Sequence, residues 1–346
     1  MKRMKQLVLL IVLYIVGTVC FSTPVNASEA LSFSYKVNHP ENQQSSDVGY
    51  FDLRMKEGQK QTVTIDLTNE SDKEIPVTVS LNGAKTNGNG VIEYGPTAID
   101  NDKSLKYDFA DIVKAPEEIT IPAKSTVPLN LDITMPATSY DGVISGGIQL
   151  KQKVDEKAKA KQSGVINEYA FLIGMILSET DTVVEPNLEL NKVSAGLNNF
   201  RNSVFVNFSN VEPAYLEGLT MDVQISQKGS DAVLYDTKKA DMRVAPNSLV
   251  DFPVSMNGEK MVPGDYKAHI VASTESKKWE WDEEFTITDE EADKYNKQDV
   301  DLTQEQGINW LIVGMIVGGV VLLVLIIFII VRLMNKGKKK KSKKKK

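Results

Sequence analysis

Side chains that commonly perform catalysis are scarce in this 346-residue sequence. It contains two histidines, His39 and His269, and a single cysteine, Cys20. Neither a GxSxG nor an HExxH pattern occurs, so two common hydrolase motifs are missing. Carboxylates are plentiful and a pair of them could hydrolyse glycosidic bonds, but a solvated acidic surface carries such residues anyway. We therefore expect no catalytic residues and no enzyme activity.

The segment 100–104 (DNDKS) begins like a calcium-binding loop, because oxygen-bearing side chains occur at alternate positions. An EF-hand loop requires glycine at its sixth position, where Leu105 stands here, and glutamate at its twelfth, which is missing. We interpret the segment as a solvated turn and expect no metal site and no cofactor. Whether Asp100 and Asp102 hold a metal ion is left open by the sequence.

The loop 86–90 (TNGNG) combines flexibility with the amides of Asn87 and Asn89, and Tyr94 follows it closely. Amides can bond sugar hydroxyls, while an aromatic ring covers the apolar face of a sugar. A second interpretation is a hairpin turn, since asparagine and glycine tolerate positive φ. Both interpretations remain open at this point.

Trp279 and Trp281 are two positions apart on a predicted strand, so their side chains share one face. If that face points outward, the two rings form a contact patch; if it points inward, they anchor the core. Phe285 and Ile287 continue the same alternation, which favours the core.

The elements that must position these residues are short segments of alternating apolar and polar residues. Such runs, separated by Asn, Gly, Asp and Ser, are typical of half-buried antiparallel strands. They occur at 61–69, 75–81, 126–133 and 169–177, and again at 203–210, 219–225, 249–254, 266–272 and 279–288. Their spacing predicts an all-β fold of two immunoglobulin-like antiparallel β-sandwich domains. The turn 263–265 before Tyr266 predicts that this tyrosine is a structural corner residue.

The two ends of the chain indicate export and a membrane anchor. A basic start, an apolar run and small residues before position 28 are the anatomy of a signal peptide, cleaved after Ala27. Lipidation at Cys20 is the alternative, although Val19 precedes it where a small residue is needed. The uncharged run 310–331 would form a helix of about 33 Å, enough to cross a bilayer.

The predicted organisation therefore has six parts. Basic residues directly after the apolar run fix the C-terminus in the cytoplasm, as in a single-pass type I membrane protein. The charged stretch 151–164 is expected to be a long exposed loop of the first domain. The parts are a signal peptide (1–27), a first β-sandwich (28–184), a second β-sandwich (185–288), a polar stalk (289–307), a transmembrane helix (308–331) and a polybasic tail (332–346).

Charge is distributed very unevenly between the two sides of the membrane. Thirteen of the 40 basic residues lie in the signal peptide and the tail, where no acidic residue occurs. The remaining 27 basic and 46 acidic residues give the exterior a net charge near −19. An exterior this negative argues against nucleic acid as a partner.

Two regions of the sequence resemble the paired modules of the WxL-interacting protein family of Gram-positive bacteria. The first region contains GYFDLRMKEGQKQTVTIDLTNES, TNGNGVIEYG, DNDKSLKYDF and MPATSYDGVISGGIQL. The second contains NFRNSVFVNFSNVEPAYLEGLTMDVQI, MRVAPNSLVDFPVSMNGEKMVPGDYKAHIVAS and KKWEWDEEFTIT. With the two ends, the resemblance covers nearly the whole chain, and it lies in the order and spacing of these segments.

The resemblance implies that the first module binds peptidoglycan and the second binds host or partner proteins, in association with secreted WxL-domain surface proteins. We therefore expect a membrane-anchored extracellular binding scaffold at the cell membrane, with its ectodomain within the wall. The alternatives are an adhesin for host matrix proteins and a carbohydrate-active wall enzyme. Candidate ligand-binding residues, which match the family at these positions, are Tyr50, Phe51, Asn87, Asn89, Tyr94, Trp279 and Trp281; Asn247 is a further matching position.

Overall fold

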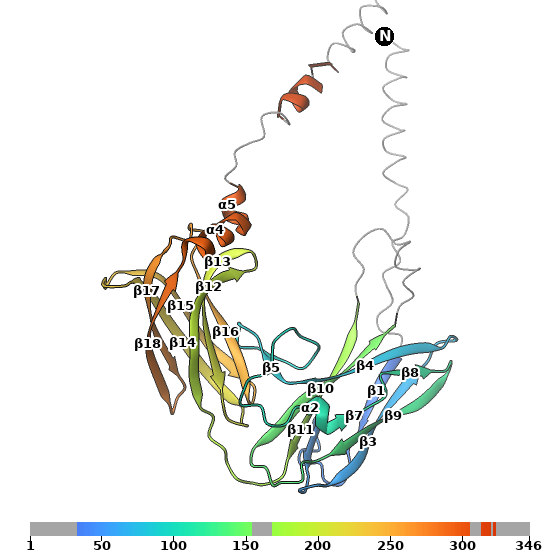
Figure 1. Ribbon diagram of the computed structural model, residues 1–346. Helices are drawn as coiled ribbons and strands as arrows, with labels where there is room; N and C mark the ends of the chain where they lie inside the picture. Colours follow the sequence, from blue (N-terminus) through green and yellow to red (C-terminus); the bar gives the residue numbers. More distant parts are fainter. Residues whose placement is uncertain (1–32, 154–167, 305–312, 320, 323–346) are drawn as a thin grey trace, which may run out of the picture.

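The computed structural model describes residues 33–153, 168–304, 313–319 and 321–322 (Figure 1). The predicted signal peptide, the polybasic tail and nearly all of the predicted charged loop 151–164 lie outside the described residues. Most of the predicted transmembrane helix lies outside them too. Within the described part of the chain, no helix is both long enough and apolar enough to span a membrane.

The first sandwich packs sheet β1-β3-β9-β7 against sheet β2-β11-β10-β4-β8, counting the strands in the described residues. Neighbouring strands are antiparallel, as predicted, except that β2 runs parallel to β11. Its strands are β1 (Phe33–Asn38), β2 (Phe51–Arg54), β3 (Lys60–Asn69), β4 (Ile75–Gly83), β7 (Val113–Lys114), β8 (Glu118–Ile121), β9 (Ser125–Thr134), β10 (Val143–Gln152) and β11 (Ala170–Ser178). A short helix, α2 (Phe109–Ile112), precedes β7.

Alternation explains why these segments become half-buried strands. In β3, Val63, Ile65 and Leu67 are buried, while the residues between them, Thr64 and Asp66, are only half-buried. They meet residues of the opposite sheet, such as Ile148 and Leu177, in one hydrophobic core. Burying an aliphatic side chain of this size stabilises the fold by roughly 1.5–3 kcal/mol relative to exposure.

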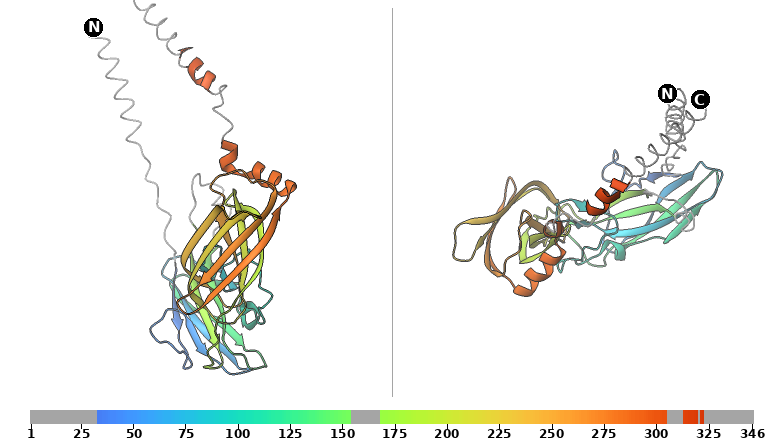
Figure 2. Two further views of the ribbon diagram at one scale, coloured as in Figure 1. Left: turned by 90° about the vertical axis from the view of Figure 1, so that its left-hand side faces the viewer. Right: turned by 90° about the horizontal axis from the view of Figure 1, so that it is seen from above.

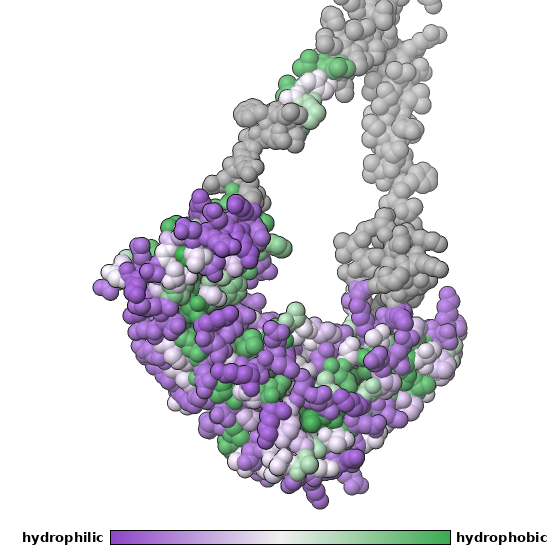
Figure 3. Space-filling view, viewed as in Figure 1, coloured by the Kyte–Doolittle hydropathy of each residue, from purple (hydrophilic) through white to green (hydrophobic). Residues whose placement is uncertain are grey.

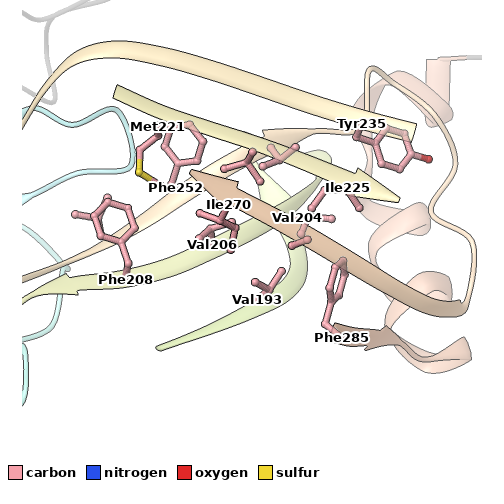
Figure 4. Close-up of a cluster of buried hydrophobic side chains, with 14 of the residues drawn as sticks. Val193, Val204, Val206, Phe208, Met221, Ile225, Tyr235, Phe252, Ile270 and Phe285 are labelled. Atoms are coloured by element: carbon pink, nitrogen blue, oxygen red, sulfur yellow. The ribbon is translucent and has the colours of Figure 1, made fainter. Parts of the chain in front are cut away.

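The second sandwich packs sheet β12-β13-β16 against sheet β15-β14-β17-β18. Its separate core gathers Val206, Phe208, Phe252 and Ile270, among others (Figure 4). Tyr266 donates a hydrogen bond from its hydroxyl to the Val262 carbonyl at 2.8 Å, which confirms the predicted corner. The strands are β12 (Leu188–Asn198), β13 (Arg201–Asn210), β14 (Leu216–Gln227), β15 (Val233–Val244), β16 (Ser248–Ser255), β17 (Gly264–Ser273) and β18 (Lys278–Ile287).

A small hairpin of the first sandwich reaches the second one. Strands β5 (Lys85–Thr86) and β6 (Ile92–Glu93) pair with each other and lie between the sandwiches (Figure 1). The Thr86 hydroxyl accepts a hydrogen bond from the Ala245 amide at 2.9 Å, and the Arg243 amide donates to the Gly90 carbonyl at 2.9 Å. These buried contacts join the two domains.

The segment predicted as a polar stalk is in large part helical among the described residues. Helix α4 (Asp289–Gln298) begins at a capping box in which Thr288 and Glu291 bond each other's backbone amides. The Asn296 side chain bonds both the amide and the carbonyl of Met261 at 2.8 Å. Helix α5 (Val300–Gln304) follows, and both helices lie at the end of the second sandwich away from β5 (Figures 1 and 2).

Candidate functional site

A groove of about 680 Å³ opens at the junction of the two sandwiches. Three tyrosines dominate its lining, so we name it the tyrosine groove. The face of the molecule in Figure 3 is mostly hydrophilic, with hydrophobic residues in small separate patches. The lining residues are Gly49, Tyr50, Tyr94, Leu172, Gly174, Ile176, Tyr215, Glu217 and Arg243.

The floor of the groove is the outer face of β11. Because alternate residues of a strand point to opposite faces, Leu172, Gly174 and Ile176 face outward while their neighbours enter the core. Gly174 is the direct cross-strand partner of Gly147 on β10. The floor is therefore flat where the two glycines meet.

Each of these two glycines leaves room for a tyrosine. A Cβ atom added to Gly147 would lie 2.4 Å from the Tyr94 carbonyl oxygen, so no larger residue fits there. A Cβ atom added to Gly174 would lie 3.6 Å from the Tyr50 Cβ, an ordinary contact distance. Tyr50 and Tyr94 thus lie over neighbouring strands and line the same groove.

The second sandwich contributes Tyr215, which lies just before β14. Its hydroxyl lies 3.2 Å from that of Tyr94 and also bonds the Ser145 hydroxyl. Burial raises the pKa of Tyr215 well above its usual value, and the nearby Tyr94 adds to this effect. The phenol is therefore neutral at physiological pH.

A bulge in the β14–β15 pair places the charged residues of the groove. The strand register shifts between Leu216 and Leu219, and Gly218, which lies within this bulge, has a φ of 65°. Beside it, Arg243 donates to the Glu217 carboxylate at 2.7 Å. Because both side chains are more than half exposed, this ion pair contributes little to stability.

A second groove of about 490 Å³ meets the first one at Glu217, which lines both. Trp279 forms part of its wall and donates from its indole nitrogen to the Asn187 side chain at 3.1 Å. The Lys277 ammonium lies 5.0 Å from the centre of the Trp279 ring, within the range of a cation–π contact.

Comparison with protein families identifies both halves of the chain. Residues 33–152 match the family described as the peptidoglycan binding domain of WxL Interacting Protein. Residues 160–297 match the host binding domain of the same protein. The chain belongs to the WxL-interacting protein family. In this WxL-interacting protein, β11 falls within the second matched segment, yet it pairs with β10 and β2 of the first sandwich.

The solved structures similar to this WxL-interacting protein share little sequence with it. The YadV chaperone is 13% identical and covers 74% of this chain and 100% of its own, with a TM-score of 0.27. The E. coli chaperone DraB is 11% identical, covers 74% and 98%, and also has a TM-score of 0.27. The PapD-like domain 7 of human CEP192 is 7% identical, covers 47% and 95%, and has a TM-score of 0.28. No curated protein sequence matches the chain.

The residues predicted to bind ligands in this WxL-interacting protein separate into different environments. Tyr50 and Tyr94 lie together in the tyrosine groove, and Trp279 lies in the adjoining one. Phe51 is 0% exposed in the first core, so its side chain cannot touch a ligand and that expectation is corrected. Trp281 is half-buried and packs against the second core, in keeping with the interpretation that its face points inward.

The loop that contains Asn87 and Asn89 is the turn of the β5–β6 hairpin. Asn87 accepts hydrogen bonds from the amides of Asn89 and Val91 at 2.9 and 3.2 Å, which fits the interpretation as a turn. The Asn89 side chain accepts a bond from Lys239 of the second sandwich at 3.1 Å. Both asparagines therefore serve contacts within the protein, at the domain junction.

The segment 100–104 also lies at the junction. The Asp102 carboxylate accepts bonds from the Ser104 amide at 2.8 Å and from the Ser209 hydroxyl of β13. Although burial raises the pKa of Asp102, these hydrogen bonds outweigh it and hold the pKa below its usual value. Among the described residues, no group of three or more histidine, cysteine, aspartate or glutamate side chains could hold a metal ion.

Asn247, a position that matches the family, joins the domains as well. Its side-chain amide donates to the Ser104 carbonyl at 3.2 Å, to the Ser104 hydroxyl at 3.1 Å and to the Val211 carbonyl at 2.9 Å. Its φ of 46° lies in the left-handed region, which asparagine tolerates better than most residues.

Three residues of the groove, Tyr215, Glu217 and Arg243, were not predicted from the sequence. A signal for the bulge was present, because Gly218 interrupts an otherwise alternating strand. Nothing local to Tyr215 indicates that it faces Tyr94, which is 121 positions away.

Proposed function

We propose that this protein is a membrane-anchored scaffold on the cell surface, which binds peptidoglycan and holds a WxL-domain protein beside the wall. The observation that carries the proposal is the tandem match of residues 33–152 and 160–297 to the two binding domains of WxL Interacting Protein. In this proposal the first domain binds the wall and the second binds the partner protein.

The anchor in this proposal is the uncharged run 310–331, with the basic tail on the cytoplasmic side. The chain would cross the membrane once, with both sandwiches outside. Since α4 packs on the second sandwich, only residues after α5 would separate that domain from the membrane. The binding domains would therefore stay close to the membrane, within the wall.

Exposed edges of the second domain support binding of a protein partner. Strands β15 and β18 end one of its sheets in the described residues. A partner strand could add main-chain hydrogen bonds to either edge. Val233 and Leu234 at the start of β15 are both nearly half exposed and would offer apolar contacts.

The scaffold is tested by a pull-down with the full-length tagged protein from detergent-solubilised membranes, read by mass spectrometry. Recovery of a secreted protein with a WxL domain is the expected result. In parallel, the full-length protein should sediment with purified peptidoglycan sacculi. If neither partner is recovered under conditions in which the protein is folded, the scaffold proposal fails.

An adhesin is the second candidate, favoured by the description of the second matched domain as host binding. Retention of the full-length protein on immobilised host matrix proteins, without recovery of a WxL-domain protein, would support it. Release of sugar fragments from sacculi would instead identify a wall enzyme and contradict both proposals.

A further inference from the structure

We infer that the tyrosine groove binds the glycan strand of peptidoglycan, and that both matched domains build this one site. The inference rests on the proposed function and deepens it. The simpler alternative is that residues 33–152 alone bind the wall and that the second domain does not contact the glycan.

The lining itself argues for a shared site. Of its nine residues, only Gly49, Tyr50 and Tyr94 lie within residues 33–152. The floor residues of β11 and the side chains of the second sandwich all lie within residues 160–297. A ligand in the groove therefore touches both matched segments at once.

The shape of the groove suits a sugar ring. A pyranose has apolar C–H faces and a polar rim, so it needs a flat apolar surface bordered by hydrogen-bonding groups. Gly174 adds no Cβ atom to the middle of the floor, and Leu172 and Ile176 on either side of it make the floor apolar. Tyr50, Tyr94 and Tyr215 also line the groove, and tyrosine combines an aromatic ring with a hydroxyl group.

The charge of the lining favours the glycan over the stem peptide. Arg243 and Glu217 bond each other at 2.7 Å, so their charges compensate. The other seven lining side chains carry no charge at neutral pH. An uncharged N-acetylated sugar fits this surface, whereas a stem peptide brings carboxylates and an ammonium group that would lack charged partners.

The groove is also preformed. Tyr94, Tyr215 and Ser145 make a chain of hydrogen bonds across the junction. The buried bond between Thr86 and Ala245 and the partly buried bond between Asn247 and Ser104 hold the two sandwiches beside it. A rigid, preorganised site loses less conformational entropy when a ligand binds. Its volume of about 680 Å³ lies within the roughly 300–1,000 Å³ of ordinary ligand sites.

The test uses the full-length protein in detergent and a defined probe, the β-1,4-linked tetramer of N-acetylglucosamine, with binding measured by calorimetry. Two variants address the groove. Tyr50→Ala removes an aromatic wall and should weaken binding about tenfold. Gly174→Val keeps a residue suited to a strand but fills the floor, so it should abolish detectable binding.

Tyr169→Ala is the matched control, since Tyr169 is exposed, lies just before β11 and does not line the groove. It should bind as the unchanged protein does. Urea unfolding of every variant shows whether the fold is kept. Tyr215→Leu, from the second sandwich, should weaken binding as strongly as Tyr50→Ala if the site is shared.

The outcomes separate this inference from the proposed function. If the unchanged protein sediments with sacculi but Tyr50→Ala and Gly174→Val bind them equally well, the wall is bound elsewhere and the inference is overturned. If Gly174→Val loses binding to an isolated stem peptide while the tetramer never binds, the glycan is the wrong ligand. If the unchanged protein binds neither sacculi nor tetramer, wall binding itself fails.

Discussion

The hydroxyl oxygens of Tyr94 and Tyr215 lie 3.2 Å apart, although Tyr94 belongs to the first sandwich and Tyr215 to the second. Tyr94 is held over Gly147 of β10, and Tyr215 bonds Ser145 on the same strand. Two of the side chains that line the groove therefore also join the domains. Any change that loosens the junction should change the groove as well.

The neighbours Tyr50 and Phe51 should respond very differently to truncation. Phe51 is 0% exposed, so Phe51→Ala should lower the free energy of unfolding by about 3–5 kcal/mol through loss of burial and a cavity. Tyr50 is only half-buried at the surface, and Tyr50→Ala should cost about 1 kcal/mol. Urea denaturation measures both values, and equal losses would contradict the assignment of Phe51 to the core.

Asn247 should stabilise the junction by its hydrogen bonds rather than by its backbone alone. Asn247→Gly removes the bonds to Ser104 and Val211 but accepts the φ of 46° without strain. We expect it to lower the free energy of unfolding by about 1–3 kcal/mol, because partly buried acceptors lose their donor.

The matched control for this junction is Asn257→Gly, because Asn257 also has a positive φ, 56°, but is exposed. It should change stability by only a few tenths of a kcal/mol. Hydrogen exchange at residues 102–105 should speed up in Asn247→Gly alone. Equal behaviour of the two variants would show that Asn247 matters only for its backbone conformation.

Asp102 should make the stability of the junction depend on pH in the acidic range. Its pKa in the folded protein lies below the usual 3.8, because the bonds from Ser104 and Ser209 favour the charged form despite burial. This stabilisation is therefore fully present above pH 3.8 and is lost as the pH falls through the lower, folded value.

The variant Asp102→Asn should be less stable than the unchanged protein by about 1–3 kcal/mol at pH 7 and at pH 5. The difference should shrink below pH 3.8, where the unchanged protein loses its own carboxylate charge. Urea denaturation at these pH values measures it, with the exposed Asp100→Asn as the control. A difference that grows as the pH falls would contradict the assignment.

The alternation of apolar and polar residues predicted the strands that have one buried face and one face near solvent. Val63, Ile65 and Leu67 enter the core while threonines stay near solvent, so the period of two is plain in the sequence. Strand β15 was missed because it lies at a sheet edge, where two lysines and two aspartates among its 12 residues obscure the alternation of apolar and polar residues. Its register is further interrupted by bulges, and Asp241 has a φ of 56°.

The groove could be predicted only in part, because its residues are far apart in the sequence and come together only in the folded protein. The family resemblance drew attention to Tyr50 and Tyr94, but Leu172 and Tyr215 reach them only when β11 and the domain junction are in place. The same resemblance included Phe51, whose side chain points the other way from its neighbour. A match in sequence does not tell a surface residue from a core residue.

Docking of α4 should depend on Asn296, a residue that the polar composition of the segment did not single out. Its amide group bonds the Met261 amide and carbonyl at 2.8 Å and accepts a bond from the Asn202 side chain at 2.8 Å. Asn296→Ala removes these bonds and should lower the free energy of unfolding by about 1–3 kcal/mol. Hydrogen exchange in residues 289–304 should accelerate, while exchange in the first sandwich stays unchanged.

The control is Lys297→Ala, because Lys297 is an exposed residue of the same helix and alanine is also a good helix former. If both variants exchange alike, Asn296 does not hold α4 on the second sandwich, and other contacts of the segment, such as the bond that the Asn202 amide donates to the Asp299 carboxylate at 2.7 Å, hold it instead.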